Sequence, residues 1–338
     1  MKAIIIGDPH FKVGNVPESE EMTRKLVEVA KERQPKFIVC LGDILHRHET
    51  IHVSPLMRAE HMIKELSKIA PTFLIIGNHD RPNNSNYLTD EHPFNSLKDW
   101  DNTYIVDKVM DVHIDDKRYI LVPYVPPGKF QEALNTLDNP WFRDMNNNDP
   151  NFVKPIIFAH QEFYGAKMGA IKSQAGDKWS LDKPLVISGH VHDYDRLQEN
   201  MIYVGTPIQS AWGESLNKAV SLFTFSDNYS WEEERIDLGL IKKVIVYLKP
   251  EDVEDYVPPE DKLVKLVIRG DDASIKMTAK LEKIKELKRK GINVVFKTLM
   301  SSGKEDNKKL FIRMGYKDSL YSTVNKDPDQ LKWFNELF

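Results

Sequence analysis

The 338-residue chain has a single cysteine, Cys40, so no disulfide can form within it. Cys40 lies inside a run of apolar residues, which is typical of a small core side chain, and a reducing compartment suits such a sequence. The sequence has no run of about 18 apolar residues, and its N-terminus has no charged segment followed by an apolar one. We therefore expect a cytoplasmic or nuclear protein without a membrane-spanning segment.

The sequence also lacks an excess of positive over negative charge. Lysine and arginine number 47 against 51 aspartates and glutamates, which leaves a net charge of −4 at pH 7. The chain as a whole is not a basic protein that binds nucleic acid over its entire surface. Any contact with nucleic acid must therefore depend on local basic patches or on metal ions. The length and the 41% of hydrophobic residues suit two globular domains, or one large domain with an appendage.

The first 80 residues alternate between strand and helix patterns. Apolar runs at Lys2–Ile6, Phe37–Leu41 and Phe73–Ile76 predict strands, and helical periodicity at Glu20–Arg33 and Pro55–Ile69 predicts the helices between them. This order implies parallel strands, whose carboxyl ends meet at one crevice. Polar residues follow each strand, so we expect them to gather at one site.

The pattern changes beyond residue 100. Short strands follow one another closely and predict a second, more antiparallel sheet. The composition shifts near Asp237–Leu240, and the acidic, proline-containing stretch Lys249–Lys262 is interpreted as a linker or irregular connection. A strand, a helix over Ala273–Lys290 and another strand then predict a small α/β unit. We therefore divide the chain into residues 1–240, which carry the polar strand ends, and residues 241–338, which we expect to cap that site and to bind DNA and a partner.

Five polar clusters follow predicted strands: Asp8-x-His10, Gly42-Asp43, Gly77-Asn78-His79-Asp80, His160 and Gly189-His190-Val191-His192. Carboxylate, amide and imidazole groups together suit Mn²⁺, Fe²⁺ or Zn²⁺. Any one cluster alone is more often a turn or a pair of solvated histidines. Their order and shared position at strand ends favour two metal ions with a bridging carboxylate, an arrangement that can clamp a phosphoryl group.

The motifs GDPH, GD, GNHD, AH and GHVH, in this order, resemble those of the calcineurin-like metallophosphoesterases over roughly Met1–Phe225. The resemblance implies an α/β fold of four layers, with two mixed β-sheets packed face to face and helices outside. It also implies two divalent metal ions, for which we expect Mn²⁺ first, with Mg²⁺, Fe²⁺ or Zn²⁺ as alternatives. Asp8, His10, Asp43 and His192 would hold one ion; Asp43, Asn78, His160 and His190 would hold the other.

The resemblance gives His79 a role other than metal ligation, in which it faces the phosphate and stabilises or protonates the leaving oxygen. Asp80 would orient His79, as carboxylates commonly orient imidazoles. His46, in the motif GDILH, resembles a histidine that serves the reaction in SbcD-type nuclease subunits of double-strand-break repair complexes. A surface position is the alternative for His46 and is our expectation for His48 and His52.

This second resemblance implies an exo- or endodeoxyribonuclease that acts in recombination or double-strand-break repair with an SbcC-type ABC ATPase as its partner. The segment Asn200–Glu214, NMIYVGTPIQSAWGE, is similar to the same nuclease subunits. The alternative is a metallophosphoesterase that acts on a phosphoprotein, a nucleotide or a cyclic nucleotide. The metal chemistry would be the same, so only the substrate separates the two hypotheses.

Three further features bear on partners. The basic face of the helix over Ala273–Lys290 would either contact DNA phosphates or be a solvated face. The apolar tail Pro328–Phe338 would either pack on its own core or dock on a partner. The family resemblance also implies a homodimer, with candidate contacts at Leu56, Met57, Met62 and Leu88.

Overall fold

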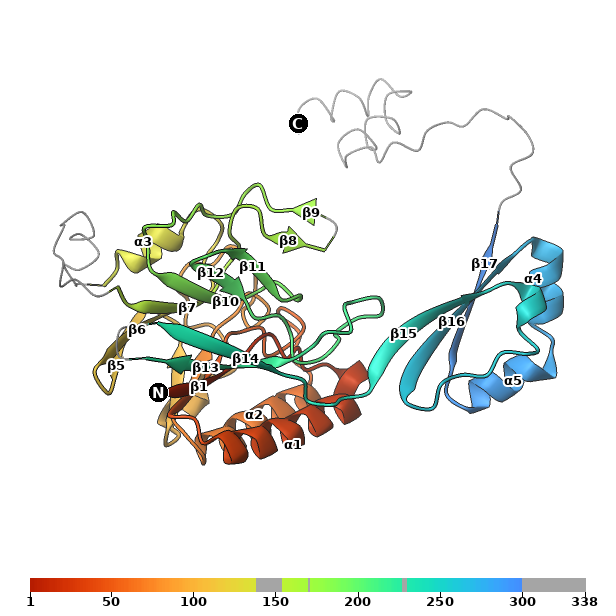
Figure 1. Ribbon diagram of the computed structural model, residues 1–338, viewed down its shortest axis with the longest axis horizontal. Helices are drawn as coiled ribbons and strands as arrows, with labels where there is room; N and C mark the ends of the chain where they lie inside the picture. The colour runs from red at the N-terminus through yellow and green to blue at the C-terminus, as the bar shows by residue number, and fades with distance from the viewer. Residues whose placement is uncertain (138–153, 170, 227–229, 300–338) are drawn as a thin grey trace, which may run out of the picture.

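The computed structural model describes residues 1–137, 154–169, 171–226 and 230–299 (Figure 1). Two mixed six-stranded sheets and a smaller three-stranded sheet form its framework. Within these ranges no helix is both long and apolar enough to cross a lipid bilayer. The tail Pro328–Phe338, for which we expected a packing or docking role, lies outside the described residues.

The first sheet has the strand order β14-β13-β1-β2-β3-β4. Its strands are β1 (Lys2–Ile6), β2 (Phe37–Cys40), β3 (Thr72–Ile75), β4 (Thr103–Val106), β13 (Val220–Phe225) and β14 (Trp231–Ile236). β1 to β4 run parallel, and β13 and β14 extend the sheet with antiparallel pairing. β2 and β3 are buried along their whole length, because parallel strands are covered on both faces.

The second sheet has the order β11-β12-β10-β7-β6-β5. Its strands are β5 (Met110–Ile114), β6 (Lys117–Val122), β7 (Ile156–His160), β10 (Leu185–Gly189), β11 (Asp195–Gln198) and β12 (Met201–Tyr203). Only the edge strands β5 and β11 pair antiparallel, so our expectation of a more antiparallel sheet is wrong. The long connections after β6 and β7 return the chain to the same edge, which gives parallel neighbours.

The two sheets pack face to face, and helices cover their outer faces. Between the sheets, the ring of Phe37 lies 5.1 Å from that of Tyr119 and 6.0 Å from that of Phe158. α1 (Val16–Arg33) and α2 (Val53–Ser67) pack on the first sheet, and α3 (Phe130–Leu134) packs on the second. The expected α/β architecture of two mixed sheets flanked by helices is therefore confirmed.

The core of the first sheet decides which residues of α2 are free to contact another molecule. Met62 has no exposed surface and lies on the same helix face as Ala59 and Leu66, so its expected place in a dimer interface is wrong. Leu56 is partly buried against this core, whereas Met57 keeps 59% of its surface exposed. Of these α2 residues, Met57 is therefore the one available to a partner.

The small sheet consists of the parallel strands β15 (Lys242–Leu248), β16 (Lys262–Gly270) and β17 (Asn293–Thr298), in that order. The stretch Lys249–Lys262 therefore connects two strands of this sheet. α4 (Asp272–Thr278) and α5 (Glu282–Arg289) replace the single helix that we expected over Ala273–Lys290.

The helix breaks because both halves bury apolar residues against the same sheet. Ile275 of α4 and Ile284 of α5 are both buried, although on a continuous helix nine residues, or about two and a half turns, would place them on opposite sides. The backbone is extended at Leu281, with φ −59° and ψ 142°, which turns α5 back onto the sheet. The periodicity of the segment predicts an apolar stripe of Met277, Leu281, Ile284 and Leu287 on a single helix, but Met277 is 72% exposed.

Glycine permits the ends of the central strands to touch. A Cβ at Gly77, after β3, would lie 2.2 Å from the backbone nitrogen of Asp43, after β2. A Cβ at Gly189, the last residue of β10, would lie 2.5 Å from Oδ1 of Asp8, after β1. Polar residues from both sheets can therefore meet only because these positions carry no side chain.

We predict that Gly77→Ala lowers the free energy of unfolding by about 1–3 kcal/mol, because the added methyl group overpacks a backbone contact. The metal content of the purified protein should fall as well, because Asp43 is displaced. Urea denaturation and metal analysis would measure both effects. Gly14→Ala is the matched control, since a Cβ at Gly14 has no atom within 4 Å. Equal stability of the two variants would contradict the close-approach argument.

Candidate metal centre

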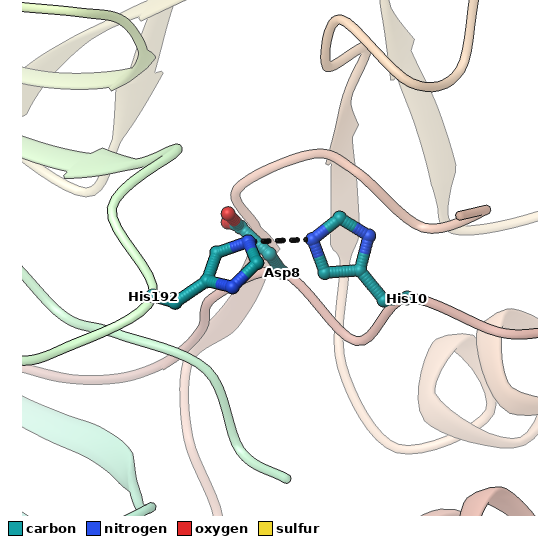
Figure 2. Close-up of side chains that lie close together, drawn as sticks. All are labelled: Asp8, His10 and His192. Atoms are coloured by element: carbon teal, nitrogen blue, oxygen red, sulfur yellow. Dashed lines mark hydrogen bonds between the residues drawn. The ribbon is translucent and has the colours of Figure 1, made fainter. Parts of the chain in front are cut away.

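The structure brings all seven predicted metal ligands to the carboxyl ends of the central strands. Asp8 and His10 follow β1, Asp43 follows β2, Asn78 follows β3, His160 ends β7, and His190 and His192 follow β10. Ligand atoms of Asp8, His10 and His192 all lie within 4.8 Å of one another, and the same holds for Asp43, His160 and His190. Figure 2 shows the first group, in which Nε2 of His10 faces Nε2 of His192 at 2.9 Å.

The second group is built around the side-chain oxygen of Asn78. Oδ1 of Asn78 lies 3.0 Å from both Nε2 of His160 and Nδ1 of His190. Nδ1 of His160 lies 2.8 Å from the carbonyl oxygen of Leu41 and donates its proton there, which leaves Nε2 directed into the site, where a metal ion would displace its proton. The imidazole is therefore held in the tautomer that a metal ion requires.

Asp43 lies between the two groups. One of its carboxylate oxygens is 3.4 Å from Nε2 of His160, and the other is 3.8 Å from Nε2 of His10. A carboxylate with one oxygen toward each group has the geometry expected of a bridging ligand. The family resemblance implies such a shared carboxylate, and the two ligand sets themselves stay a prediction.

Three of these residues have left-handed backbone conformations. His10, Asp43 and His190 have φ of 49°, 47° and 80°. For non-glycine residues such conformations cost about 1–3 kcal/mol each and persist only where the surroundings enforce them. The strain is therefore concentrated at the residues whose side chains are turned into the site.

Buried negative charge dominates the electrostatics of the site. Asp8 and Asp43 are 0% and 2% exposed, and within the described ranges neither forms an ion pair with a lysine or arginine. Burial raises the pKa of Asp8 to about 6. Burial opposes protonation of His160, but the carboxylates of Asp43 and Asp8 outweigh it and raise the pKa of His160 to about 9. An acceptor-rich, buried site of this kind fits divalent cations.

His79 is close to both groups but belongs to neither. Its backbone N–H donates to Oδ1 of Asp43 at 2.8 Å, and Nδ1 of its ring lies 2.9 Å from the carbonyl oxygen of His46. Its Nε2 lies 3.9 Å from Oδ2 of Asp43, and 30% of the side chain is exposed. The ring therefore presents Nε2 to whatever occupies the site, as a residue that acts on the substrate would.

Asp80 has a different role from the one we expected. The atom that orients the His79 ring is the carbonyl oxygen of His46 rather than the Asp80 carboxylate. The carboxylate of Asp80 accepts three backbone hydrogen bonds at 2.9–3.2 Å, from the N–H groups of Ile44, Leu45 and Gly77. Asp80 therefore ties the loop after β2 to the loop after β3 and supports the ligands on both.

His46 lies at the edge of the site. Its ring is edge-on to His10 at 5.2 Å and parallel to His79 at 5.9 Å between ring centroids. Burial lowers the pKa of His46 to about 4, and the charge of Lys12 acts in the same direction. His48, which we expected at the surface, stacks on His79 at 4.6 Å. The His-x-His spacing after the Gly-Asp motif was the available signal for His48.

Glu214 is a site residue that the sequence motifs did not identify. Its Oε1 lies 3.3 Å from Nδ1 of His192, and its Oε2 accepts the N–H of Ser210 at 2.9 Å and lies 3.3 Å from Nζ of Lys218. A carboxylate behind a metal-ligating imidazole fixes the tautomer and raises the basicity of the ring. Only its place at the end of the segment Asn200–Glu214 hinted at such a role.

Gln209 joins the loop of Glu214 to the small sheet. Its Oε1 accepts the N–H of Lys243 at 2.6 Å, and its Nε2 lies 3.0 Å from the carbonyl oxygen of Lys243 and 3.1 Å from that of Glu214. The side chain is 5% exposed, so these bonds are shielded from water. The first residues of β15 are therefore fixed to the loop that supports His192.

Comparisons with known proteins agree with this geometry. The sequence profile of the family described as "Calcineurin-like phosphoesterase" matches residues 1–194. The putative phosphoesterase 244L of Invertebrate iridescent virus 6 is 40% identical over 283 residues, which cover 81% of this chain and 96% of the viral protein. The chain belongs to the calcineurin-like phosphoesterases.

Other relatives are also viral. The putative phosphoesterase 078R of Invertebrate iridescent virus 3 is 38% identical over 304 residues, which cover 88% of this chain and 84% of that protein. Protein R555 of Acanthamoeba polyphaga mimivirus, described as uncharacterized, is 26% identical over 214 residues, or 58% of this chain and 15% of its own length. Calcineurin-like phosphoesterases bind divalent metals, and this member brings together two groups of side chains that suit them.

We predict that Asp80→Asn destabilises this calcineurin-like phosphoesterase by about 1–3 kcal/mol, because an amide NH₂ would face backbone N–H groups that now donate to a carboxylate. Urea denaturation would measure the loss. Asp99→Asn, at an exposed position, is the control. If both variants unfold at the same urea concentration, Asp80 does not hold the two loops together.

Proposed function

We propose that this calcineurin-like phosphoesterase is a metal-dependent nuclease that hydrolyses phosphodiester bonds in DNA. The supporting observation is that cavities open on two flanks of the site. One, of about 380 Å³, is lined by Lys12, His46 and Arg47 among others. The other, of about 600 Å³, is lined by Lys167 and Trp212 together with His190 and His192.

A polymer needs room on both sides of the scissile phosphate, whereas a phosphomonoester needs room on one side. Each flank also carries a cationic side chain that suits a neighbouring phosphate. Lys12 and Arg47 lie on one flank, and Lys167, which is 3.6 Å from Asp195, lies on the other. These features favour a nucleic acid strand over a phosphoprotein or a free nucleotide.

The geometry described above supports the two ligand sets that the family resemblance implies. Asp8, His10, Asp43 and His192 would hold one ion, and Asp43, Asn78, His160 and His190 the other. Two such ions, with Mn²⁺ as our first expectation, would lower the pKa of a water nucleophile and neutralise charge on the phosphoryl oxygens. Glu214 would keep His192 in its ligating tautomer, as Leu41 does for His160.

His79 would carry the proton for the leaving oxygen. Its Nδ1 is engaged by the carbonyl oxygen of His46, so Nε2 is the atom that can donate. Burial lowers the pKa of His79 in the free protein, and an anionic phosphodiester beside the ring would raise it. Because burial also keeps His46 neutral, we assign His46 to hydrogen bonding with the substrate rather than to proton transfer.

We predict cleavage of linear DNA in Mn²⁺ and little hydrolysis of p-nitrophenyl phosphate, a cyclic nucleotide or a phosphopeptide. His79→Asn should slow DNA cleavage by about 10²–10⁴-fold, because it removes the proton donor, and should keep its metals. Asp43→Ala should lose activity and metals together.

The control for these variants is His113→Asn, at an exposed position of β5, which should behave like the unaltered chain. If the His79→Asn variant loses its metals, His79 is a metal ligand rather than a proton donor. Hydrolysis of the phosphopeptide or nucleotide in preference to DNA would establish the alternative function.

We extend the proposal to partners. With a net charge of −4, this chain alone would have limited affinity for DNA. An SbcC-type ATPase would supply additional contacts to the DNA. Such an ATPase from the same genome should co-purify with the chain and change its rate of DNA cleavage. If it does neither, it is not the partner.

We also propose a homodimer that forms through the exposed part of α2 around Met57. Sedimentation at micromolar concentration should show a dimer, and Met57→Glu should shift it to a monomer because a charge would be buried at the contact. Arg47→Glu, outside α2, is the control for an added negative charge. If the unaltered chain sediments as a monomer, the proposed homodimer is wrong.

A further inference from the structure

Among the described residues, no helix covers one face of the small sheet. Even-numbered residues of its strands, such as Leu266, Ile268 and Val294, pack against the apolar residues of α5. Successive side chains of a strand point to opposite faces, so the odd-numbered residues share the other face. We call this face, which also includes Lys243, Leu263 and Asn293, the open face. Its other residues are Ile245, Tyr247, Lys265, Val267, Arg269, Val295 and Lys297, of which Val267 is buried. In Figure 1, α4 and α5 lie on the side of the sheet away from the two larger sheets.

The open face combines an exposed aromatic ring with unpaired positive charge. Tyr247 is 55% exposed, and the guanidinium of Arg269 lies 4.3 Å from the centre of its ring. Arg269 pairs with Lys297 across the strands, so their side chains are neighbours. Among the described residues, neither of these cations nor Lys265 forms an ion pair, and the open face carries no acidic side chain.

The helix face of the same unit differs from the open face in that many of its cations form ion pairs. Its cations are paired with acids on the same helix: Lys285 lies 3.0 Å and Arg289 2.8 Å from Glu282, and Lys290 lies 2.7 Å from Glu286. These cations share two glutamates, so the helix face stays basic, but its paired side chains are already engaged within the unit. The open face differs in that Lys265, Arg269 and Lys297 form no such pairs among the described residues and in that it carries an exposed aromatic ring, which favours it as the surface for a nucleic acid.

The open face also begins next to the metal centre. A Cβ at Gly213 would lie 3.5 Å from Cδ1 of Ile245, so this loop touches the first strand of the open face. Gly213 and Trp212 line the 600 Å³ cavity that contains His190 and His192. Because Gln209 binds the backbone of Lys243, the contact between loop and strand is held in place. A chain that leaves this cavity can therefore continue directly onto the open face.

We propose that the open face binds single-stranded nucleic acid that leads to the metal centre. Bases would stack on Trp212 and Tyr247, and Lys265, Arg269 and Lys297 would contact phosphates. A single strand is favoured over a duplex because the faces of paired bases are not accessible to an aromatic side chain on a sheet. The proposal rests on the proposed nuclease function and adds the surface and the strandedness of the substrate.

The test measures binding of a fluorescent oligothymidylate and of a duplex in EDTA, so that no cleavage occurs, over a series of salt concentrations. The unaltered chain should bind the single strand more tightly. Tyr247→Ala should weaken binding by about 5- to 150-fold through loss of stacking, and Tyr247→Phe should restore most of it. Arg269→Gln and Lys297→Gln should each reduce the salt slope by about 0.7.

The matched controls are Lys285→Gln and Arg289→Gln, on the helix face of the same unit, which should leave affinity and salt slope unchanged. The reverse result, with the helix variants weakening binding and the open-face variants not, would overturn the proposal. So would tighter binding of the duplex. Unchanged melting temperatures would show that the variants remain folded.

Hydrogen exchange of β15 and β16 in the full chain separates a ligand surface from one covered by residues 300–338. If exchange of these strands slows only when the oligonucleotide is present, the proposal is supported. If exchange is equally slow without it, the chain itself covers the open face. Failure of the nuclease function is distinct, because the unaltered chain would then cleave no DNA. If the open-face variants still cleave DNA with unchanged KM, the proposal that the open face binds the substrate is wrong, while the nuclease function stands.

Discussion

Two carboxylates, Asp8 and Asp43, are buried at the centre of the molecule with no lysine or arginine beside them in the described ranges. Isolated buried charge is among the most unfavourable features that a fold can contain, and it persists where cations or protons offset it. The strained backbones of His10, Asp43 and His190 and the backbone contacts at Gly77 and Gly189 all serve to place acceptors around this charge. The fold therefore stores its least favourable interactions where a divalent ion can relieve them.

Much of this arrangement could be predicted from the sequence. Apolar runs that end in Asp8, Asp43 and Asn78 predict parallel strands, and parallel strands deliver their carboxyl ends to one edge. His160, His190 and His192 follow from the same rule applied to the second sheet. Local pattern and global topology agree at these positions, so the sequence predicts the candidate ligands together with the strands.

The remaining features depend on contacts between segments that are far apart in the sequence. Asp80 is adjacent to His79 along the chain, yet its carboxylate points to the backbone after β2, which no local motif reveals. Glu214 supports His192 across 22 residues, and Gln209 binds Lys243 across 34. The helix over Ala273–Lys290 has good helical periodicity, but burial of both Ile275 and Ile284 on one sheet breaks it. In each case tertiary packing overrides a local preference.

The lone thiol has a practical consequence for following this enzyme in solution. Cys40 ends β2 with no exposed surface, and burial raises its pKa to about 12, so it is inert toward alkylating reagents. The folded chain therefore behaves as a cysteine-free protein, and one cysteine introduced on the exposed side of α5 would carry a spin label at a single defined place. Mn²⁺ is paramagnetic, so if the proposed ions are Mn²⁺, their coupling to such a label would report the distance between the small sheet and the ends of the central strands.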